Sequence, residues 1–152
     1  MLKQIRNWLK SESIDFKEVH HEITKTSEES AEARGEDISI GGKALVIKID
    51  GTFKILVLSA AKKLNSTAVK KYFSSKKMRF ASKDELWELT GLVPGSVPPF
   101  GRPVIDLDLY VDNSILENDK IAFNAGSLTD SVVMKREDYV ALAKPIVFSF
   151  SE

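Results

Sequence analysis

The alternation of hydrophobic and polar residues predicts short helices and strands in mixed order. Leu2, Ile5 and Leu9 recur at helical spacing, which predicts a helix over residues 1–13. Further helices are expected over residues 26–35, 65–73, 82–91 and 136–143, with a turn or short helix over 113–118. Strands are expected over residues 15–20, 43–49, 52–58, 80–81, 104–111, 120–123, 131–135 and 146–150. This order predicts a single α+β domain over residues 1–152, with a mixed, largely antiparallel, barrel-like sheet and surrounding helices.

Turn and cap residues support these boundaries. Asp50 and Gly51 separate two β-rich runs and supply the positive φ of a tight hairpin. Both runs are almost wholly apolar, so we expect them near the centre of the sheet. Thr26 and Glu29 have capping-box spacing and open a helix that should end at Gly35.

A proline- and glycine-rich stretch, residues 91–106, holds four of the five prolines and three of the eight glycines. Proline removes a backbone donor, so the stretch is neither a helix nor a central strand. We expect a rigid, irregular loop, called here the Pro/Gly loop. Its free N–H groups and small side chains suit it to hold a polar ligand, although it could equally serve as a structural crossover.

Composition excludes several classes of protein. The hydrophobic share of 43% and the charged share of 29% are typical of globular proteins. The absence of cysteine excludes disulfides, thiolate metal sites and cysteine nucleophiles, and two histidines without zinc-ligand spacing leave no metal site or cofactor expected. No apolar run approaches the roughly 20 residues of a membrane span, and the first residues lack a secretion signal. We therefore expect a cytoplasmic monomer or small homo-oligomer that does not associate with membranes.

The charge is unevenly distributed. The net charge of zero argues against a protein that coats nucleic acid. Residues 51–83, however, hold nine basic residues and no acidic one. Such a patch suits a partner with a small phosphate footprint, or it is only the solvated face of a helix and its flanks.

Four short motifs are spread along the chain. They are Thr26-Ser-Glu-Glu-Ser-Ala-Glu-Ala33, Gly42-Lys43-Ala-Leu-Val46, Gly95-Ser-Val-Pro-Pro-Phe-Gly101 and Ala125-Gly126-Ser127. In order and spacing they resemble the YbaK/prolyl-tRNA synthetase-associated domain family, whose members hydrolyse wrongly charged aminoacyl-tRNA. The resemblance implies the fold of that family and a trans-acting deacylase. Its substrate would be the ester of a mischarged tRNA, either tRNA-Pro or another tRNA carrying Cys, Ala, Ser or Thr.

The resemblance also implies the catalytic parts. A lysine at the position of Lys43 is essential in the family, and no side-chain nucleophile is used. Its ammonium could anchor the terminal phosphate or stabilise the tetrahedral intermediate, unless Lys43 is an ordinary solvent-exposed lysine. Gly95 and Pro99 match a Gly-x-x-x-Pro pattern whose backbone dipoles would hold the ester and orient water. The neighbouring ribose hydroxyl would assist.

Further residues are implied as binding residues. The substrate contacts would be His20, Thr26, Ser96, Phe100, Gly101, Asn124, Gly126 and Ser127, and the tRNA contacts would be Lys62, Lys63, Lys70 and Lys71. His20 and His21 alternate in direction on a strand, so only one of them can face a pocket. Gly126 and Ser127 could simply form a turn. Some alanine-removing members carry a histidine near the position of Asn124, which argues against an alanine-specific enzyme.

A second hypothesis comes from a different class of protein. The same pocket could hold an aminoacyl-adenosine-like ligand without catalysis, as a module that docks on an aminoacyl-tRNA synthetase. Lys43 discriminates between the two hypotheses, because only an enzyme should lose turnover and keep ligand affinity when this lysine is removed.

Overall fold

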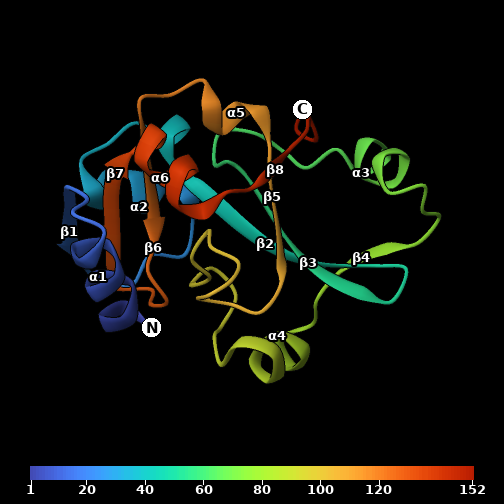
Figure 1. Cartoon of the computed structure of the whole chain (residues 1–152), viewed down its shortest axis with the longest axis horizontal. Coiled ribbons are helices and arrows are strands. Elements are labelled where there is room, and N and C mark those ends of the chain that lie inside the picture. Colours follow the sequence, from blue (N-terminus) through green and yellow to red (C-terminus); the bar gives the residue numbers. More distant parts are fainter.

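Two β-sheets pack around a shared core in the computed structural model, which describes all 152 residues (Figure 1). The helices are α1 (Leu2–Ser11), α2 (Ser27–Arg34), the 3-10 turn η1 (Ile38–Ile40), α3 (Ser66–Tyr72), α4 (Lys83–Thr90), α5 (Asn113–Leu116) and α6 (Arg136–Ala143). The strands are β1 (Phe16–His20), β2 (Gly42–Ile49), β3 (Thr52–Ser59), β4 (Met78–Phe80), β5 (Asp108–Val111), β6 (Lys120–Asn124), β7 (Asp130–Lys135) and β8 (Ile146–Val147). The predicted α+β class is confirmed. No helix is long and apolar enough to cross a lipid bilayer.

The two sheets differ in their strand directions. The smaller sheet, β1-β7-β6, is antiparallel, and the larger has the order β4-β2-β3-β5-β8. Within the larger sheet β4, β2 and β3 are antiparallel, whereas β3, β5 and β8 are parallel. One parallel bridge between Gly41 and Ala122 links the sheets. The β2–β3 hairpin turns at Asp50 and Gly51, and both strands lie inside the sheet, as their apolar sequences predicted.

The core has two parts, on the two faces of the larger sheet. The larger part lies between the sheets and takes in Ile5 and Leu9 of α1 and Phe100 of the Pro/Gly loop, all fully buried. The smaller part lies under α3 and includes Val69 and Phe150. In Figure 1 the smaller sheet and α1 lie on the left, and the β2–β3 hairpin extends to the right, toward α3.

The Pro/Gly loop is irregular, as predicted, but it continues further than expected. The predicted strand over residues 104–111 begins only at Asp108, so the prediction is wrong for its first half. The N–H groups of Val104 and Ile105 both donate to the carbonyl of Gly101, which folds this segment into turns. Ile105 is nevertheless buried, and this burial explains the alternating pattern.

The last predicted strand, residues 146–150, is also shorter in the structure, because only Ile146–Val147 pair with β5. The N–H groups of Phe150 and Ser151 donate instead to the buried Asp112 carboxylate, at 2.6 and 3.1 Å. Burial raises the pKa of Asp112, but hydrogen bonds from Ser114, Ser151 and Phe150 outweigh it and hold the pKa below its ordinary value.

Helix α2 begins and ends as its sequence predicts. The Thr26 side chain accepts from the N–H of Glu29 at 3.1 Å, and the helix ends at Gly35 with φ of 69°. The expected capping box is incomplete, because the Glu29 carboxylate accepts from Lys25, one residue before the cap. These caps hold both ends of α2, the helix that borders the candidate site.

Candidate active site

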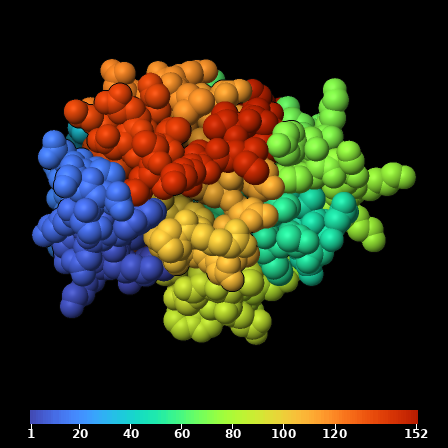
Figure 2. All heavy atoms as spheres, in the orientation of Figure 1, coloured from blue at the N-terminus to red at the C-terminus, as the bar shows by residue number.

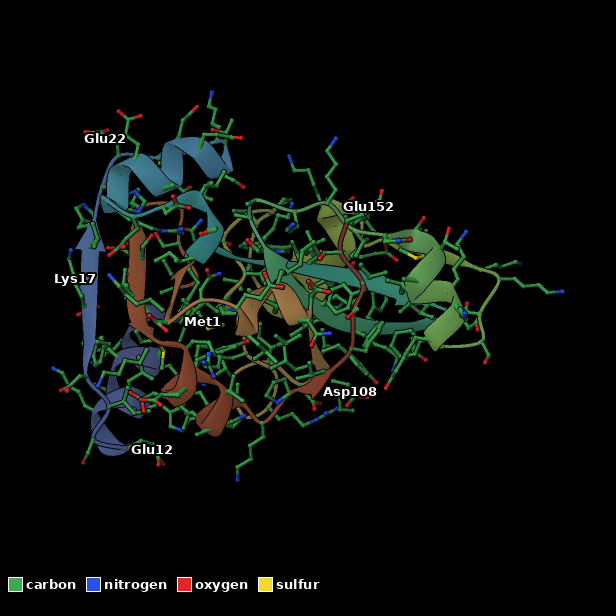
Figure 3. The ribbon with its side chains drawn as sticks, turned by 90° about the horizontal axis from the view of Figure 1, so that it is seen from above. Met1, Glu12, Lys17, Glu22, Asp108 and Glu152 are labelled. Carbon is green, nitrogen blue, oxygen red and sulfur yellow. The ribbon has the colours of Figure 1, made fainter.

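A cavity of about 450 Å³ lies where β2 begins, between α2 and the Pro/Gly loop. Strand β4 pairs with β2 only over residues 47–49, so the edge over residues 42–45 is left open and lines the cavity. In the view of Figure 3, α2 follows Glu22 at one end of the molecule, and β2 runs toward the other end. The lining includes the cations Lys25, Arg34 and Lys43 and no carboxylate, so the cavity suits an electron-rich ligand.

Lys43 is the second residue of β2 and is half-buried in this lining. Its Nζ donates to the carbonyl of Lys62 at 3.3 Å and has no carboxylate partner within 4 Å. Burial lowers the pKa of Lys43, because it disfavours the charged form, and Glu28 opposes the shift in part. The ammonium donates one hydrogen bond to Lys62 and therefore keeps further donors for a ligand.

The Pro/Gly loop borders the same cavity with two residues whose backbone N–H groups are unpaired. Gly95 and Val97 line it, and neither N–H group makes a hydrogen bond within the protein. Gly95 has a φ of 88°, a conformation that glycine adopts without strain. Its carbonyl accepts from the Asn124 side chain at 2.7 Å, which fixes the loop against β6. The free N–H groups are therefore held in a defined place.

Arg34, at the end of α2, is only 8% exposed and also lines the cavity. Its Nε donates to Ser131 Oγ at 3.0 Å and its Nη2 to Asn124 Oδ1 at 3.1 Å, and both partners are neutral. Burial lowers the pKa of Arg34 to about 10, which corresponds to about 3 kcal/mol of disfavoured charge at neutral pH. A buried cation without a carboxylate partner is costly for folding, which favours a role in binding.

The two histidines point in different directions, as the strand alternation predicted. The His20 side chain is 78% exposed, pairs with Asp130 at 2.8 Å and does not line the cavity. The His21 ring lies 2.8 Å from Ser131 Oγ, the hydroxyl that also contacts Arg34. His21 therefore belongs to the hydrogen-bond network behind the cavity, and His20 lies outside it.

The structure brings together some of the residues named for the site and separates others. Lys43, Gly95, Thr26 and Asn124 line the cavity. Ser96, Pro99, Phe100 and Gly101 are buried in the Pro/Gly loop behind the lining.

The buried loop residues have structural partners. Phe100 packs against three aromatic rings of the core, and the hydroxyl of Tyr139 donates to the carbonyl of Pro99. The Ser96 side chain closes a turn with Val93. A role for these residues in binding would thus be indirect, through the shape of the loop.

Gly126 and Ser127 form a turn, the alternative that their sequence left open. The N–H of Gly126 donates to the carbonyl of Ser96 at 2.9 Å, and Met1 occupies the space that a side chain would need. The Ser127 hydroxyl contacts Thr129 at 2.9 Å. Neither residue lines the cavity.

The predicted basic patch divides between the two ends of β2. Lys62 and Lys63 follow β3 and lie beside Lys43. Lys70 belongs to a separate cavity of about 640 Å³ at the tip of the β2–β3 hairpin, and Lys71 lines neither cavity. The cations of this second cavity, called here the hairpin-tip cluster, are Lys48, Lys70, Lys76, Lys77 and Arg79. At about 3.3 Å per residue, strand β2 separates the two cavities by about 20 Å.

Sequence reasoning missed Arg34, and it left His21 and Ser131 without a role. One signal for Arg34 was present, because it follows Ser30 by four residues on the face of α2 that also carries Ala31. A cation on the small-residue face of a short helix points toward the protein rather than toward solvent.

Comparison with known proteins identifies the family. The family model of the aminoacyl-tRNA editing domain matches residues 21–142. The chain is 36% identical over 148 residues to the multifunctional Ser/Thr-tRNA deacylase ProXp-y of Escherichia coli (strain K12), covering 93% of this chain and 87% of that protein. It is 35% identical over 101 residues to the proline–tRNA ligase of Shouchella clausii (strain KSM-K16), covering 66% of this chain and 18% of the ligase.

A solved structure shares the fold. The crystal structure of a proposed trans-editing enzyme for prolyl-tRNA synthetase matches with a TM-score of 0.86 at 23% identity, covering 99% of this chain and 96% of that one. The chain therefore belongs to the aminoacyl-tRNA editing domain family. It is an aminoacyl-tRNA deacylase, as the sequence resemblance implied.

Proposed function

We propose that this deacylase removes serine and threonine from mischarged tRNA by hydrolysing the ester to the terminal ribose. The cavity carries the proposal, since it joins a free ammonium, free backbone N–H groups and neutral hydrogen-bonding side chains. The relative that is 36% identical over nearly the whole chain is named for the same two amino acids. Both amino acids carry a hydroxyl that a polar cavity can bind.

The lining restricts the mechanism. It contains no histidine, aspartate or glutamate, so no side chain there is suited to act as a general base at neutral pH. Serines of the lining have no adjacent base to activate them as nucleophiles. The remaining group beside the ester is the neighbouring ribose hydroxyl, which can orient the attacking water.

Charge develops on the carbonyl oxygen as water attacks. The ammonium of Lys43 and the N–H groups of Gly95 and Val97 are the donors that would stabilise this oxyanion. When the tetrahedral intermediate collapses, the ester bond breaks, the ribose oxygen takes a proton from the attacking water, and the free amino acid leaves. Catalysis then depends on placed donors and not on a covalent intermediate.

The tRNA would enter with its acceptor end beside Lys62 and Lys63. Both lysines are exposed near Lys43, where they can contact phosphates without entering the cavity. A synthetase partner, a monomer or small homo-oligomer and a cytoplasmic location remain predictions.

The test is hydrolysis of one tRNA charged in turn with serine, threonine, alanine, cysteine or proline, with wild type and a folded Lys43→Ala protein. We expect the seryl and threonyl esters to be hydrolysed fastest and the variant to lose that activity. An unchanged rate in the variant would remove Lys43 from the mechanism. Failure to hydrolyse any ester, with retained affinity for an aminoacyl-adenosine analogue, would identify a binding module.

A further inference from the structure

One nitrogen of the Arg34 guanidinium, Nη1, has no partner in the protein. Nε and Nη2 are occupied by Ser131 and Asn124, whereas Nη1 makes no hydrogen bond. Every side-chain nitrogen or oxygen that is fully sealed from solvent does have a partner, so Nη1 retains access to the cavity. The structure thus holds the guanidinium in place at two nitrogens and leaves the third available to donate.

The free donor lies beside a part of the cavity wall that has no side chains. Nη1 is 3.6 Å from the point where a Cβ of Gly41 would stand, and Gly41 and Gly42 both line the cavity. No carboxylate in the lining can satisfy it. An oxygen of the ligand is therefore the partner that this donor lacks.

The position of Arg34 Nη1 within the cavity limits which oxygen of the ligand can reach this nitrogen. The ribose and the rest of the tRNA are bulky and must stay outside the cavity, on the side of the exposed Lys62, whose carbonyl accepts from Lys43. Arg34 and Ser30 are the most buried polar residues of the lining, so we infer that Arg34 faces the part of the ligand that enters furthest. In an aminoacyl ester that part is the amino-acid side chain.

We propose that Arg34 is a specificity-determining residue, whose Nη1 donates a hydrogen bond to the side-chain hydroxyl of the aminoacyl group. This inference rests on the proposed function and adds to it the means of selecting serine and threonine. A cavity of about 450 Å³ is too large to select such small side chains by size alone. A hydroxyl satisfies the donor, whereas an alkyl group of equal size leaves it buried and unpaired.

The experiment compares seryl-tRNA with 2-aminobutyryl-tRNA, in which a methyl group replaces the hydroxyl, on the same tRNA. We expect wild type to prefer the seryl ester by about 10- to 100-fold in kcat/KM, the effect of one charged hydrogen bond. In Arg34→Met the seryl rate should fall by a similar factor and the 2-aminobutyryl rate should change by less than about threefold. Arg34→Lys should keep part of the preference, because an ammonium can still donate.

Arg6→Met is the matched control, since Arg6 pairs with Glu18 on the surface and does not line the cavity. It should keep the wild-type preference. An equal fall of both rates in Arg34→Met would overturn the proposal, because it would indicate only a supporting role for the network. A wild-type enzyme that hydrolyses both esters equally would overturn it without any variant, even if Arg34→Met did not fold.

A failure of the proposed hydrolysis can be distinguished from a failure of the role of Arg34. If wild type hydrolyses neither ester, calorimetry with the amide-linked seryl and 2-aminobutyryl adenosine analogues tests Arg34 alone. Tighter binding of the seryl analogue by about 10-fold or more supports the role of Arg34. Equal or undetectable binding of the two analogues contradicts it.

Discussion

A basic cavity lies at each end of strand β2. The two cavities differ in how deeply their cations are buried and in whether a carboxylate lines them. At the first end Arg34 is buried, Lys43 is half-buried, and no carboxylate lines the cavity. At the other end the hairpin-tip cluster is mostly exposed, and Asp50 belongs to the same lining. Figure 2 shows the hairpin and α3 at the end of the molecule opposite the N-terminal segment, with long side chains reaching into solvent.

This difference separates two uses of positive charge. An exposed ammonium is hydrated and screened by salt, so it can attract phosphate over a distance but contributes little to any single geometry. A buried and hydrogen-bonded cation acts in a lower dielectric and keeps its position, so it can stabilise charge at one atom. The cavity that contains Lys43 and Arg34 is therefore suited to catalysis, and the hairpin-tip cluster is suited to weak contacts with the tRNA backbone.

The largest expected effect comes from the same substitution at two places on β2. Lys43→Met should lower the single-turnover rate by about 10²- to 10³-fold, as the loss of one oxyanion donor does. Lys48→Met, at the hairpin tip, should leave that rate within about twofold at saturating enzyme. Rapid-quench assays with seryl-tRNA measure both. Similar losses in the two variants would show that the cavities do not differ in function.

An intermediate effect is expected from pH. The folded-state pKa of Lys43 lies below its ordinary value of 10.5, so the ammonium loses its proton earlier than a solvated lysine would. The ratio of the enzymatic to the spontaneous rate should therefore fall as the pH rises through that lowered pKa. Lys43→Arg should keep its charge over the whole range, with a lower but flatter ratio. A ratio in wild type that stays flat through pH 10.5, the ordinary lysine pKa, would contradict a catalytic ammonium.

The smallest effect is expected at the hairpin-tip cluster. Replacing Lys70, Lys76 and Lys77 by glutamine should weaken tRNA binding several-fold and reduce the salt slope by about one unit for each phosphate that the variant no longer binds. Arg79→Gln is the matched control, since Arg79 is already bound to Glu85 through two hydrogen bonds of 2.7 and 2.9 Å. Its effect on affinity should be smaller than that of any one lysine. Fluorescence anisotropy at several salt concentrations measures these changes.

Short-range patterns in the chain were enough to predict most of the helices and strands and the position of Lys43. The cap at Thr26, the stop at Gly35 and the turn at Asp50 and Gly51 are choices made by residues close together in the chain. Lys43 stands at the start of β2 for the same reason. Such features follow from backbone preferences and hydrogen bonds within a few residues, so local patterns are enough to predict them.

Tertiary packing selects the residues that surround the cavity. Arg34 meets Ser131 across 97 positions of sequence, and the Asn124 side chain holds Gly95 across 29. It also decided that His21, not His20, faces this network. These contacts depend on how the smaller sheet, α2 and the Pro/Gly loop pack together, and the balance of burial and hydrogen bonding that sets this packing is spread over distant residues.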